Sequence, residues 1–555
     1  MIEPGANNFF TRFLWLFILL GALFMMFQLQ QLPLRDLSQD EGLFAAVASE
    51  MQISLPMSIA HGVGIKNRYF LYPLLSSIIS ENSALQLNAV LRYLNFFFIA
   101  VSAALIGIIA GLTRDFKAGV IGAAFFTANG FIFMHSQNAS SLMMGSCLLF
   151  AAQTAWIYFG FTKGHWNIAW LISLILVSAG FLTEGIKIPV YFFLPLFFMH
   201  RPLKFGSKIN KKGFAAGMII LGAALLLWLV PTVTYSRNLT WDYIPLDYRG
   251  MGNFLLNIIV SPLQIMLLML PWTLIVWMPF CAAIKPLDKT PIFSHYYRCI
   301  VITDFIFILF NPLSTMNDFI FTIPPLALLC AITYDTAVRR YSVEMRRLTL
   351  LCCYIMVLLG AGLILYCFVP FDTLKNYVDL MPLNNNKEPV FGTILAFLLL
   401  ALWMYHYRKY GQLWLIMFLT GVCIGFFCHL TFITRQNADR SRSQLGKAIL
   451  RMIQFDGGNT NAIIYKNNIL DLYSESYYMQ TNVRKINNFD AIDKKAPVIY
   501  LLTTNFPQYS ERTWKNLYET TYRGQKLYLC RGETAKRKEL ISRRRLRNNL
   551  QDEEK

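Results

Sequence analysis

The sequence predicts a mainly α, polytopic membrane protein with about 13 transmembrane helices, outer-face juxtamembrane helices in the first loop, and a small C-terminal α/β domain. Three observations support this fold class. The 555-residue chain is 55% hydrophobic and only 15% charged, and apolar runs of about 17 residues or more recur along most of it. Basic residues gather in alternate connections between these runs. From residue 435 the pattern changes to the short strands and helices of a soluble domain.

The apolar runs give the expected spans and the division of the chain. The spans are expected at residues 13–29, 91–112, 118–134, 141–160, 167–183, 186–200, 214–235, 255–284, 298–311, 318–335, 348–369, 390–407 and 412–433. We therefore expect a membrane domain over 1–434 with a first outer loop at 30–90, an outer α/β domain over 435–535, and a basic, disordered tail over 536–555.

The distribution of charge predicts how the chain is oriented. Although the net charge is +19, the Lys and Arg residues lie mainly in alternate short loops, which are cytoplasmic by the positive-inside rule. This distribution excludes nucleic acid as a partner and favours the lipid bilayer. We expect a cytoplasmic N-terminus and a C-terminal domain on the outer side of the membrane.

The C-terminal domain can be divided into elements from its pattern alone. The segments "NAIIYKN", "APVIYLLTT" and "QKLYLCRG" have the apolar and β-branched content of strands. The segments "NILDLYSESYYM" and "ERTWKNLYETTYRG" are expected to be helices. The basic end "KRKELISRRRLRNN" suits contact with anionic head groups, or solubility.

An acidic pair opens the first outer loop in "RDLSQDEGLFAAVASEM". Ser38 and Glu41 have the spacing of a capping box, and Phe44, Val47 and Met51 continue as an apolar stripe, so we expect a helix on the membrane surface. Glu41 suffices as the capping partner. Asp40 is a surplus acid, either a solvated first-turn residue or a general base or cation ligand at the outer face.

Several motifs of this chain resemble those of GT-C glycosyltransferases. "QDEGLFAAVASEM", "GIKNRYFLYPLL" and the Arg92 that opens the second span resemble the first outer loop of the lipid A aminoarabinose transferases and their protein O-mannosyltransferase relatives. Further along, "FLTEGIKIP" resembles the family's F-L-T-K-G, and "MLPW" its L-P-W. No single motif is specific, but their order and the expected topology match this branch.

The resemblance implies a chemistry and a set of site residues. Such enzymes pass a sugar from a polyprenyl-phosphate donor to an acceptor on the outer side of the membrane. Asp40, with Glu41 beside it, corresponds to the catalytic acid, which acts as a base or orients the acceptor. Candidate cations for the donor phosphate are Lys66, Arg68, Arg249 and Arg92. The alternatives are contact with lipid head groups for the first three and a structural pair with an acid for Arg92. Residues expected to line the site are Tyr72, His135 and Glu184, where the chain departs from the family, and Asp304, to which the family assigns no role.

The chain also departs from the family pattern at four polar positions. The E-K-P motif is replaced by Leu71–Tyr72–Pro73, and the Lys of T-K-G by Glu184. The second Asp, after the third span, is missing, and "NPLSTMNDFIF" lacks the late Lys and Tyr. These changes indicate either a site rebuilt for another donor or acceptor, or a loss of catalysis.

The expected function is the transfer of a sugar from a polyprenyl phosphate to a lipid A-type lipid, a protein or a glycan. No cofactor is required by the motifs, although Asp40 and Glu41 could hold a divalent cation. Asp304 falls within an apolar run, where it should be neutral, paired or facing a wet cavity. Two alternatives stay open: a non-catalytic relative that binds a polyprenyl lipid or a partner, and a transporter or flippase, although no internal repeat supports the latter.

Overall fold

The structure is a computed structural model of the whole chain. It describes residues 35–51, 59–61, 63–65, 70–136, 138–234, 241–242, 251–311, 314–368, 413–428, 440–457, 463–467, 472–486, 496, 498–507 and 512–534. The expected spans 13–29 and 390–407, and the basic tail 536–555, lie outside these ranges.

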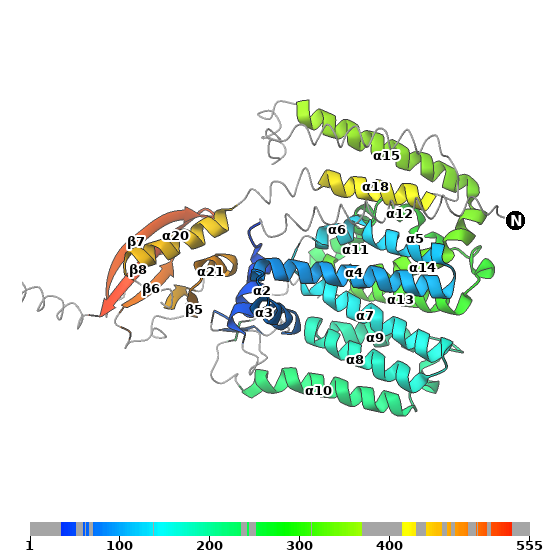
Figure 1. Cartoon of the computed structure of the whole chain (residues 1–555), viewed down its shortest axis with the longest axis horizontal. Helices are drawn as coiled ribbons and strands as arrows, with labels where there is room; N and C mark the ends of the chain where they lie inside the picture. Colours follow the sequence, from blue (N-terminus) through cyan, green and yellow to red (C-terminus); the bar gives the residue numbers. More distant parts are fainter. Residues whose placement is uncertain are drawn as a thin grey trace, which may run out of the picture.

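A bundle of long apolar helices forms most of the molecule (Figure 1), and the chain is an integral membrane protein. In the described ranges, 7 helices are long and apolar enough to cross a membrane, or up to 9 if two bent pairs each count as one span. The straight candidates are α4 (Leu87–Thr113), α7 (Ser141–Ile157) with the π-helical turn η2 (Tyr158–Thr162), α8 (Trp166–Glu184), α10 (Lys212–Thr234), α13 (Pro291–Phe310), η7 (Met316–Phe321) with α14 (Ile323–Arg340), and α15 (Ser342–Phe368). The expected number of about 13 is not confirmed.

Within the described residues, four of the expected spans are not single membrane-length helices, and the one at 412–433 is the short α18 (Leu413–Cys428). Helices α5 (Phe116–Thr127) and α6 (Gly130–Ser136) meet at 59°, and the expected span at 255–284 divides at 112° between α11 (Met251–Leu268) and α12 (Thr273–Val276) with η5 (Met278–Phe280). The expected span at 186–200 is the short α9 (Lys187–Phe197). Its 11 residues are about 16 Å long, half of a hydrocarbon core of about 30 Å.

The tryptophan of the "MLPW" motif stabilises one of these bends. Trp272 is completely buried and its indole N–H donates to the carbonyl of Ala128, 3.0 Å away, where α5 ends. A bend releases backbone groups that must find partners inside a membrane protein. Trp272 therefore joins the two bent pairs of helices to each other.

Helix α2 (Gln39–Glu50) and helix α3 (Leu71–Asn82) form most of the described first loop. The capping box is confirmed, since the Ser38 side chain accepts from the Glu41 N–H and the Glu41 side chain from the Ser38 N–H. The prediction that only one stripe of this helix is apolar and buried is wrong. Every residue from Glu41 to Ala48 is buried, because α3, α4 and the C-terminal domain all pack around α2.

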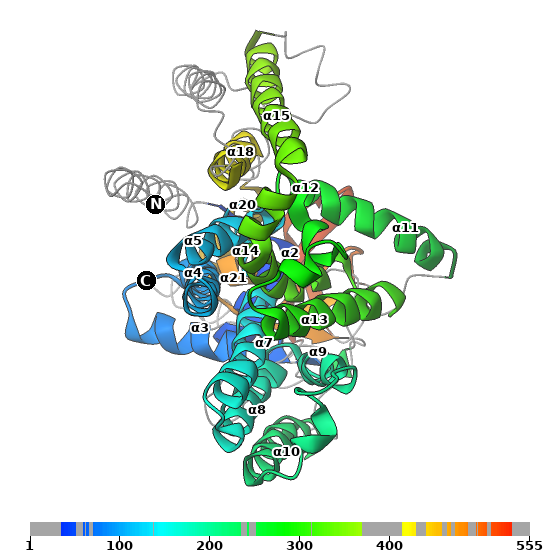
Figure 2. The same cartoon turned by 90° about the vertical axis from the view of Figure 1, so that its right-hand side faces the viewer.

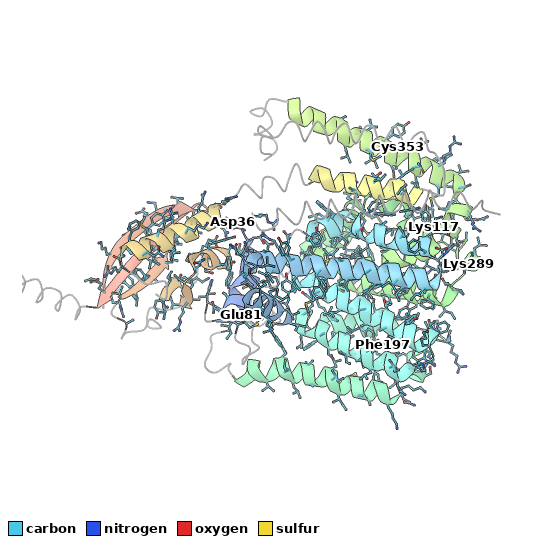
Figure 3. The ribbon with its side chains drawn as sticks, viewed as in Figure 1. Asp36, Glu81, Lys117, Phe197, Lys289 and Cys353 are labelled. Carbon is cyan, nitrogen blue, oxygen red and sulfur yellow. The ribbon has the colours of Figure 1, made fainter. Side chains whose placement is uncertain are left out.

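Figure 3 labels charged residues at both ends of the bundle. Asp36 and Glu81 lie at the end that contacts the C-terminal domain, whereas Lys117 and Lys289 lie at the opposite end. We name these the domain end and the basic end of the bundle.

The C-terminal domain is a mixed five-stranded sheet with two helices. The strand order is β5-β4-β6-β8-β7, parallel among the first three and antiparallel among the last three. The elements are α20 (Ser441–Phe455), β4 (Ile463–Asn467), α21 (Tyr473–Met479), β5 (Asn482–Ile486), β6 (Val498–Thr503), β7 (Arg512–Tyr522) and β8 (Gln525–Thr534). Strands β4, β6 and β8 confirm the sequence expectation, whereas α20 and β5 were not anticipated.

The helix expected at "ERTWKNLYETTYRG" is wrong, because this segment forms strand β7. Its Thr, Trp and Tyr residues favour strands, and β7 pairs along most of its length with β8. Arg523 and Gly524 join the two strands with φ of +50° and +75°, the left-handed conformation that two-residue hairpin turns need at both positions. The "RG" pair was thus the available signal for a hairpin.

The C-terminal domain is docked directly on α2. Ser474 of α21 donates to the Ser38 carbonyl at 2.6 Å, and the Ser443 N–H of α20 donates to the Asp36 carboxylate at 2.8 Å. At the other side of this contact, His61 stacks on Tyr473 with ring centroids 4.8 Å apart. The first loop and the C-terminal domain therefore lie on the same side of the membrane.

Gly42 allows this docking, and we expect Gly42→Ala to loosen it. A Cβ at residue 42 would lie 2.2 Å from Ser474 Oγ and 2.4 Å from the Ser474 backbone nitrogen, which cannot rotate away. Overpacking of this kind costs about 1–3 kcal/mol. Amide hydrogen exchange in α21 should accelerate. The matched control is Gly111→Ala on α4, where nothing lies within 4 Å of the new Cβ; equal exchange in both variants would contradict the tight contact.

Candidate functional site

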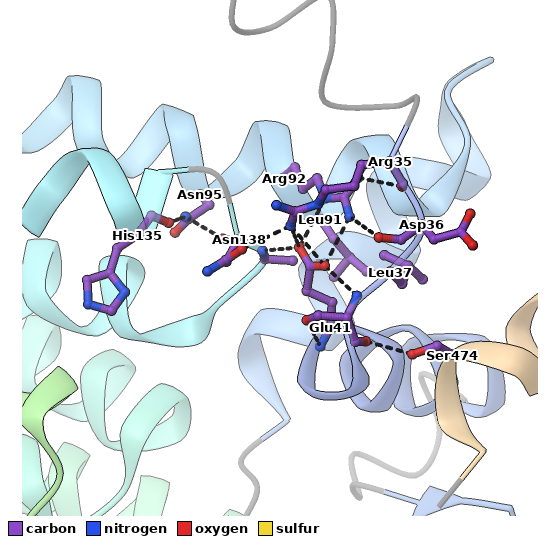
Figure 4. A network of polar contacts seen from close by, with 12 residues as sticks. Arg35, Asp36, Leu37, Glu41, Leu91, Arg92, Asn95, His135, Asn138 and Ser474 are labelled. Carbon is purple, nitrogen blue, oxygen red and sulfur yellow. Dashed lines mark hydrogen bonds and ion pairs between the residues drawn. The ribbon is translucent and has the colours of Figure 1, made fainter. Parts of the chain in front are cut away.

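The candidate site lies at the domain end of the bundle, where α2 begins against α4 and the loop before α7. Its centre is the carboxylate of Glu41, which is 1% exposed. Six hydrogen bonds of 2.7–3.1 Å reach this carboxylate, from Arg35, Arg92 and the backbone N–H groups of Ser38 and Ala139. Figure 4 shows these contacts converging on Glu41 from three separate segments.

The charges of this cluster stabilise one another. Burial alone would raise the pKa of Glu41, but the neighbouring Arg92 and Arg35 outweigh it and hold the pKa at about 2. Burial lowers the pKa of Arg35, an effect that Glu41 partly offsets. The cluster of Arg35, Glu41 and Arg92 is thus an ionised, hydrogen-bonded anchor that joins the first loop to the bundle.

The structure places Arg92 in this anchor. Besides its two bonds to Glu41, its guanidinium donates to the carbonyls of Arg35 and Asp36 at 3.0 and 3.1 Å, and the side chain has no exposed surface. These contacts use four of the five N–H groups of an arginine. Contact with a donor phosphate would require Arg92 to give up some of them.

Asp40 occupies a different environment from its neighbour. It lies in the first turn of α2 and is exposed, whereas Glu41 points into the anchor. The two adjacent acids therefore face different surroundings: Glu41 is held by arginines and Asp40 is exposed. The anchor holds the backbone that carries Asp40 in a defined position.

Tyr72 and His135 lie near the anchor without belonging to it. Tyr72 is completely buried, donates its hydroxyl to the Leu91 carbonyl at 2.6 Å and meets Phe44 edge to face. The His135 carbonyl accepts from Asn95 at 2.7 Å, while Figure 4 shows its ring on the side away from Glu41. Both contacts position α4 and the loop after α6.

A second polar group, which the sequence reasoning missed, lies where α8 turns into α9. Gly185, at φ +72°, ends α8, and Lys187 begins α9 with an ion pair of 2.9 Å to Asp318 in η7. Asp318 is 1% exposed and also accepts from the Thr315 N–H, whereas the Lys187 side chain keeps 27% of its surface exposed. The signal was present in "FLTEGIKIP", since Lys187 lies two residues beyond the Gly185 that ends the F-L-T-K-G motif.

The first turns of α7 separate the two polar groups. Ala139, just before α7, binds Glu41, while Ser146 of α7 donates to the Ile320 carbonyl of η7 and Gly145 packs against the Glu184 side chain. Seven residues at 1.5 Å each place the groups on the order of 10 Å apart along α7.

The other site residues from the sequence have mixed outcomes. Asp304 is completely buried in the half of α13 toward the domain end, and neither of its carboxylate oxygens has a hydrogen-bond partner among the described residues.

Three of the candidate phosphate-binding residues, Lys66, Arg68 and Arg249, lie outside the described residues. The strand β2 (Val63–Ile65), just before Lys66, pairs with β3 (Trp241–Asp242) and so joins the first loop to the loop that leads to α11. No group of three or more metal-ligating side chains occurs in the described part of the chain.

Comparison with solved structures shows the fold of a known membrane protein. ArnT from Cupriavidus metallidurans in the apo state superimposes with a TM-score of 0.67 at 12% identity, covering 95% of this chain and 98% of that chain. The same protein bound to undecaprenyl phosphate gives 0.64 at 12% identity, covering 93% and 98%. An oligosaccharyltransferase from Archaeoglobus fulgidus in complex with zinc and sulfate gives 0.40 at 11% identity, covering 81% and 59%.

No family model and no curated protein sequence matches the chain. The resemblance to the GT-C aminoarabinose transferases, to which ArnT belongs, is thus confirmed at the level of the fold.

Proposed function

We propose that this protein is a membrane glycosyltransferase that moves a sugar from a polyprenyl-phosphate donor to an envelope acceptor on the outer face of the membrane. The acceptor class is a lipid A-type lipid, a protein or a glycan. The observation that carries the proposal is an exposed carboxylate, Asp40, at the domain end of a fold shared with ArnT over 95% of the chain, on a helix start that the buried anchor holds in place.

In this proposal Asp40 acts as the general base. A hydroxyl or amine of the acceptor attacks the anomeric carbon of the sugar and gives its proton to Asp40. The bond between that carbon and the phosphate oxygen breaks, and polyprenyl phosphate leaves with the electron pair. The anchor contributes orientation, because a carboxylate on a fixed helix start loses little freedom when the acceptor binds.

Lys187 is the described residue best suited to the donor phosphate. An ammonium group has three N–H donors, and the Asp318 carboxylate accepts at 2.9 and 3.1 Å, which leaves a donor for a ligand. Asp318 holds the Lys187 ammonium in place. The Lys187 side chain is partly exposed, so a ligand can reach it. Lys187 would thus provide a cation near the position where Glu184 replaces the family's lysine.

Neutralising this ion pair should weaken donor binding. Lys187→Gln alone would leave the buried Asp318 unpaired, so the test is the double variant Lys187→Gln/Asp318→Asn, which preserves hydrogen bonding without either charge. We expect its dissociation constant for undecaprenyl phosphate to rise at least tenfold, or about 1.4 kcal/mol. Lys187→Arg, as the control, should bind as wild type does. Wild-type affinity in the double variant would place the phosphate elsewhere.

The proposed topology has a cytoplasmic N-terminus and a periplasmic C-terminal domain in the bacterial inner membrane. Contact between α2 and α21 requires an even number of crossings between residues 90 and 440. The expected spans after the first loop number about 12, which satisfies this condition. The position of Lys117 and Lys289 at the basic end supports a cytoplasmic location for that end.

Mass spectrometry of envelope lipids, glycoproteins and glycans provides the decisive test. Cells that contain the protein should carry a sugar-modified species that cells without it lack. The absence of any such species would favour the non-catalytic alternative, in which the chain binds a polyprenyl lipid without transferring its sugar. The four changed polar positions are the reason to include this outcome in the design.

A further inference from the structure

A large apolar groove runs along α13 on the side that faces α9, and the proposed chemistry makes no use of it. Its volume is about 980 Å³. Figure 2 shows α9 and α13 side by side. The groove extends from His295, in the first turns of α13, to Asn311 just after its end. Sixteen residues at 1.5 Å give about 24 Å, most of a hydrocarbon core of about 30 Å.

The walls of this α9–α13 groove are suited to hydrocarbon chains. Leu194 and Phe198 line one side, and Ile302, Ile306 and Phe310 the other. The last four of these side chains are substantially exposed in the folded chain, between 46% and 59%. A groove lined by apolar side chains and open to the bilayer can hold acyl chains.

Basic side chains gather at only one end of the groove, the basic end of the bundle. Lys285, His295 and Arg298 belong to the groove itself. A neighbouring cavity of about 420 Å³, at the end of α9, adds His200, Arg201 and Lys204. The two cavities adjoin at the end of α9, where Phe198 lines the groove and Phe197 and Met199 line the smaller cavity, so their basic side chains lie in one region.

Most of this charge is uncompensated within the described residues. Arg298 is held by Asp288 at 3.2 Å and by the Pro279 carbonyl at 2.7 Å. Neither the Lys285 ammonium nor the His295 ring forms a hydrogen bond or ion pair with another described residue. Asp288 is thus the only acid found in contact with the described basic side chains of this region, and a ligand with negative charge is favoured.

We propose that the α9–α13 groove binds an anionic phospholipid of the cytoplasmic leaflet. Its phosphate lies between Lys285 and His295, near Arg201 and Lys204, and its acyl chains follow α13 toward the domain end. The combination of a basic cluster at one end with a long apolar channel matches a phospholipid in both charge and shape.

This lipid is distinct from the sugar donor. Lys187 and Asp40 lie at the domain end, whereas the basic cluster lies beyond the opposite end of α9, about 16 Å of helix away. A donor whose phosphate was held at Lys285 would keep its sugar far from Asp40. The inference therefore holds whether or not the chain transfers sugar.

Native mass spectrometry of the full chain tests the proposal. The protein is reconstituted in nanodiscs of phosphatidylglycerol and phosphatidylethanolamine and then released into detergent. Wild type should retain phosphatidylglycerol in preference to phosphatidylethanolamine. Lys285→Ala/His295→Ala should lower the retained fraction at least tenfold. Ile306→Trp, which fills the groove with a bulky ring, should lower it without removing any charge.

The matched control is Arg339→Ala/Arg340→Ala, which removes two exposed cations from the basic end of α14, outside the groove. This variant should retain phosphatidylglycerol as wild type does. Equal losses in the control and in the groove variants would overturn the proposal. So would equal retention of the two phospholipids by wild type, or displacement of phosphatidylglycerol from the groove by undecaprenyl phosphate.

Discussion

Asp40→Asn is expected to abolish sugar transfer while leaving the protein folded. The substitution keeps the shape of the side chain and its place in the first turn of α2 but removes the charge and the basicity. Loss of a general base typically costs on the order of 10²–10⁴ in rate. Loss of the interaction with the helix dipole costs only about 0.3–1 kcal/mol. The measurement is the amount of sugar-modified envelope species, together with the yield and thermal stability of the purified variant.

Glu81→Gln serves as the control for this prediction. Glu81 is another exposed acid at the domain end, at the end of α3, and its neutralisation should leave transfer unchanged. If Asp40→Asn transfers sugar at the wild-type rate, Asp40 is a solvated first-turn residue and the base lies elsewhere.

Glu41→Gln, in contrast to Asp40→Asn, is expected to destabilise the fold of the protein. An amide can still accept from the Ser38 N–H and so complete the capping box. It cannot neutralise Arg35 and Arg92, whose side chains are 7% and 0% exposed. Removing one partner from a buried ion pair typically costs 3–5 kcal/mol, because an uncompensated charge remains in the interior. The thermal unfolding temperature and the extracted yield should both fall.

Asp40→Asn is the control here, since it removes the same charge one residue earlier in the chain. A Glu41→Gln protein as stable as Asp40→Asn would show that the anchor contributes little beyond the cap. Replacing Arg35, Glu41 and Arg92 together with apolar residues of similar size should recover much of the stability, because no unpaired charge is then buried.

The low pKa of Glu41 gives this comparison a dependence on pH. Glu41 has a pKa of about 2 in the folded chain against an ordinary value of 4.5. A depressed folded-state pKa stabilises the protein fully above pH 4.5, and this contribution declines as the pH falls toward 2. The difference in stability between wild type and Glu41→Gln should therefore narrow over that acidic window. A constant difference down to pH 2 would contradict the ionised anchor.

The sequence by itself determined the features that depend on local pattern and composition. Apolar runs identified a membrane protein, because only long apolar helices satisfy their own backbone groups in lipid. The Ser38–Glu41 spacing predicted the start of α2, since a capping box involves neighbouring residues alone. Strands β4, β6 and β8 were evident for the same reason. The ordered motifs around Asp40 also indicated a GT-C fold, which the comparison with ArnT confirms.

Only the tertiary structure decided what surrounds these elements. Glu41 meets Arg92 and Ala139 across 51 and 98 residues of sequence, and Lys187 meets Asp318 across 131, separations at which no spacing rule applies. Helix α2 is buried because a domain about 400 residues later packs against Gly42. Such contacts depend on how the whole chain closes on itself. For this reason two adjacent acids that look alike in the sequence, Asp40 and Glu41, have different environments in the folded protein.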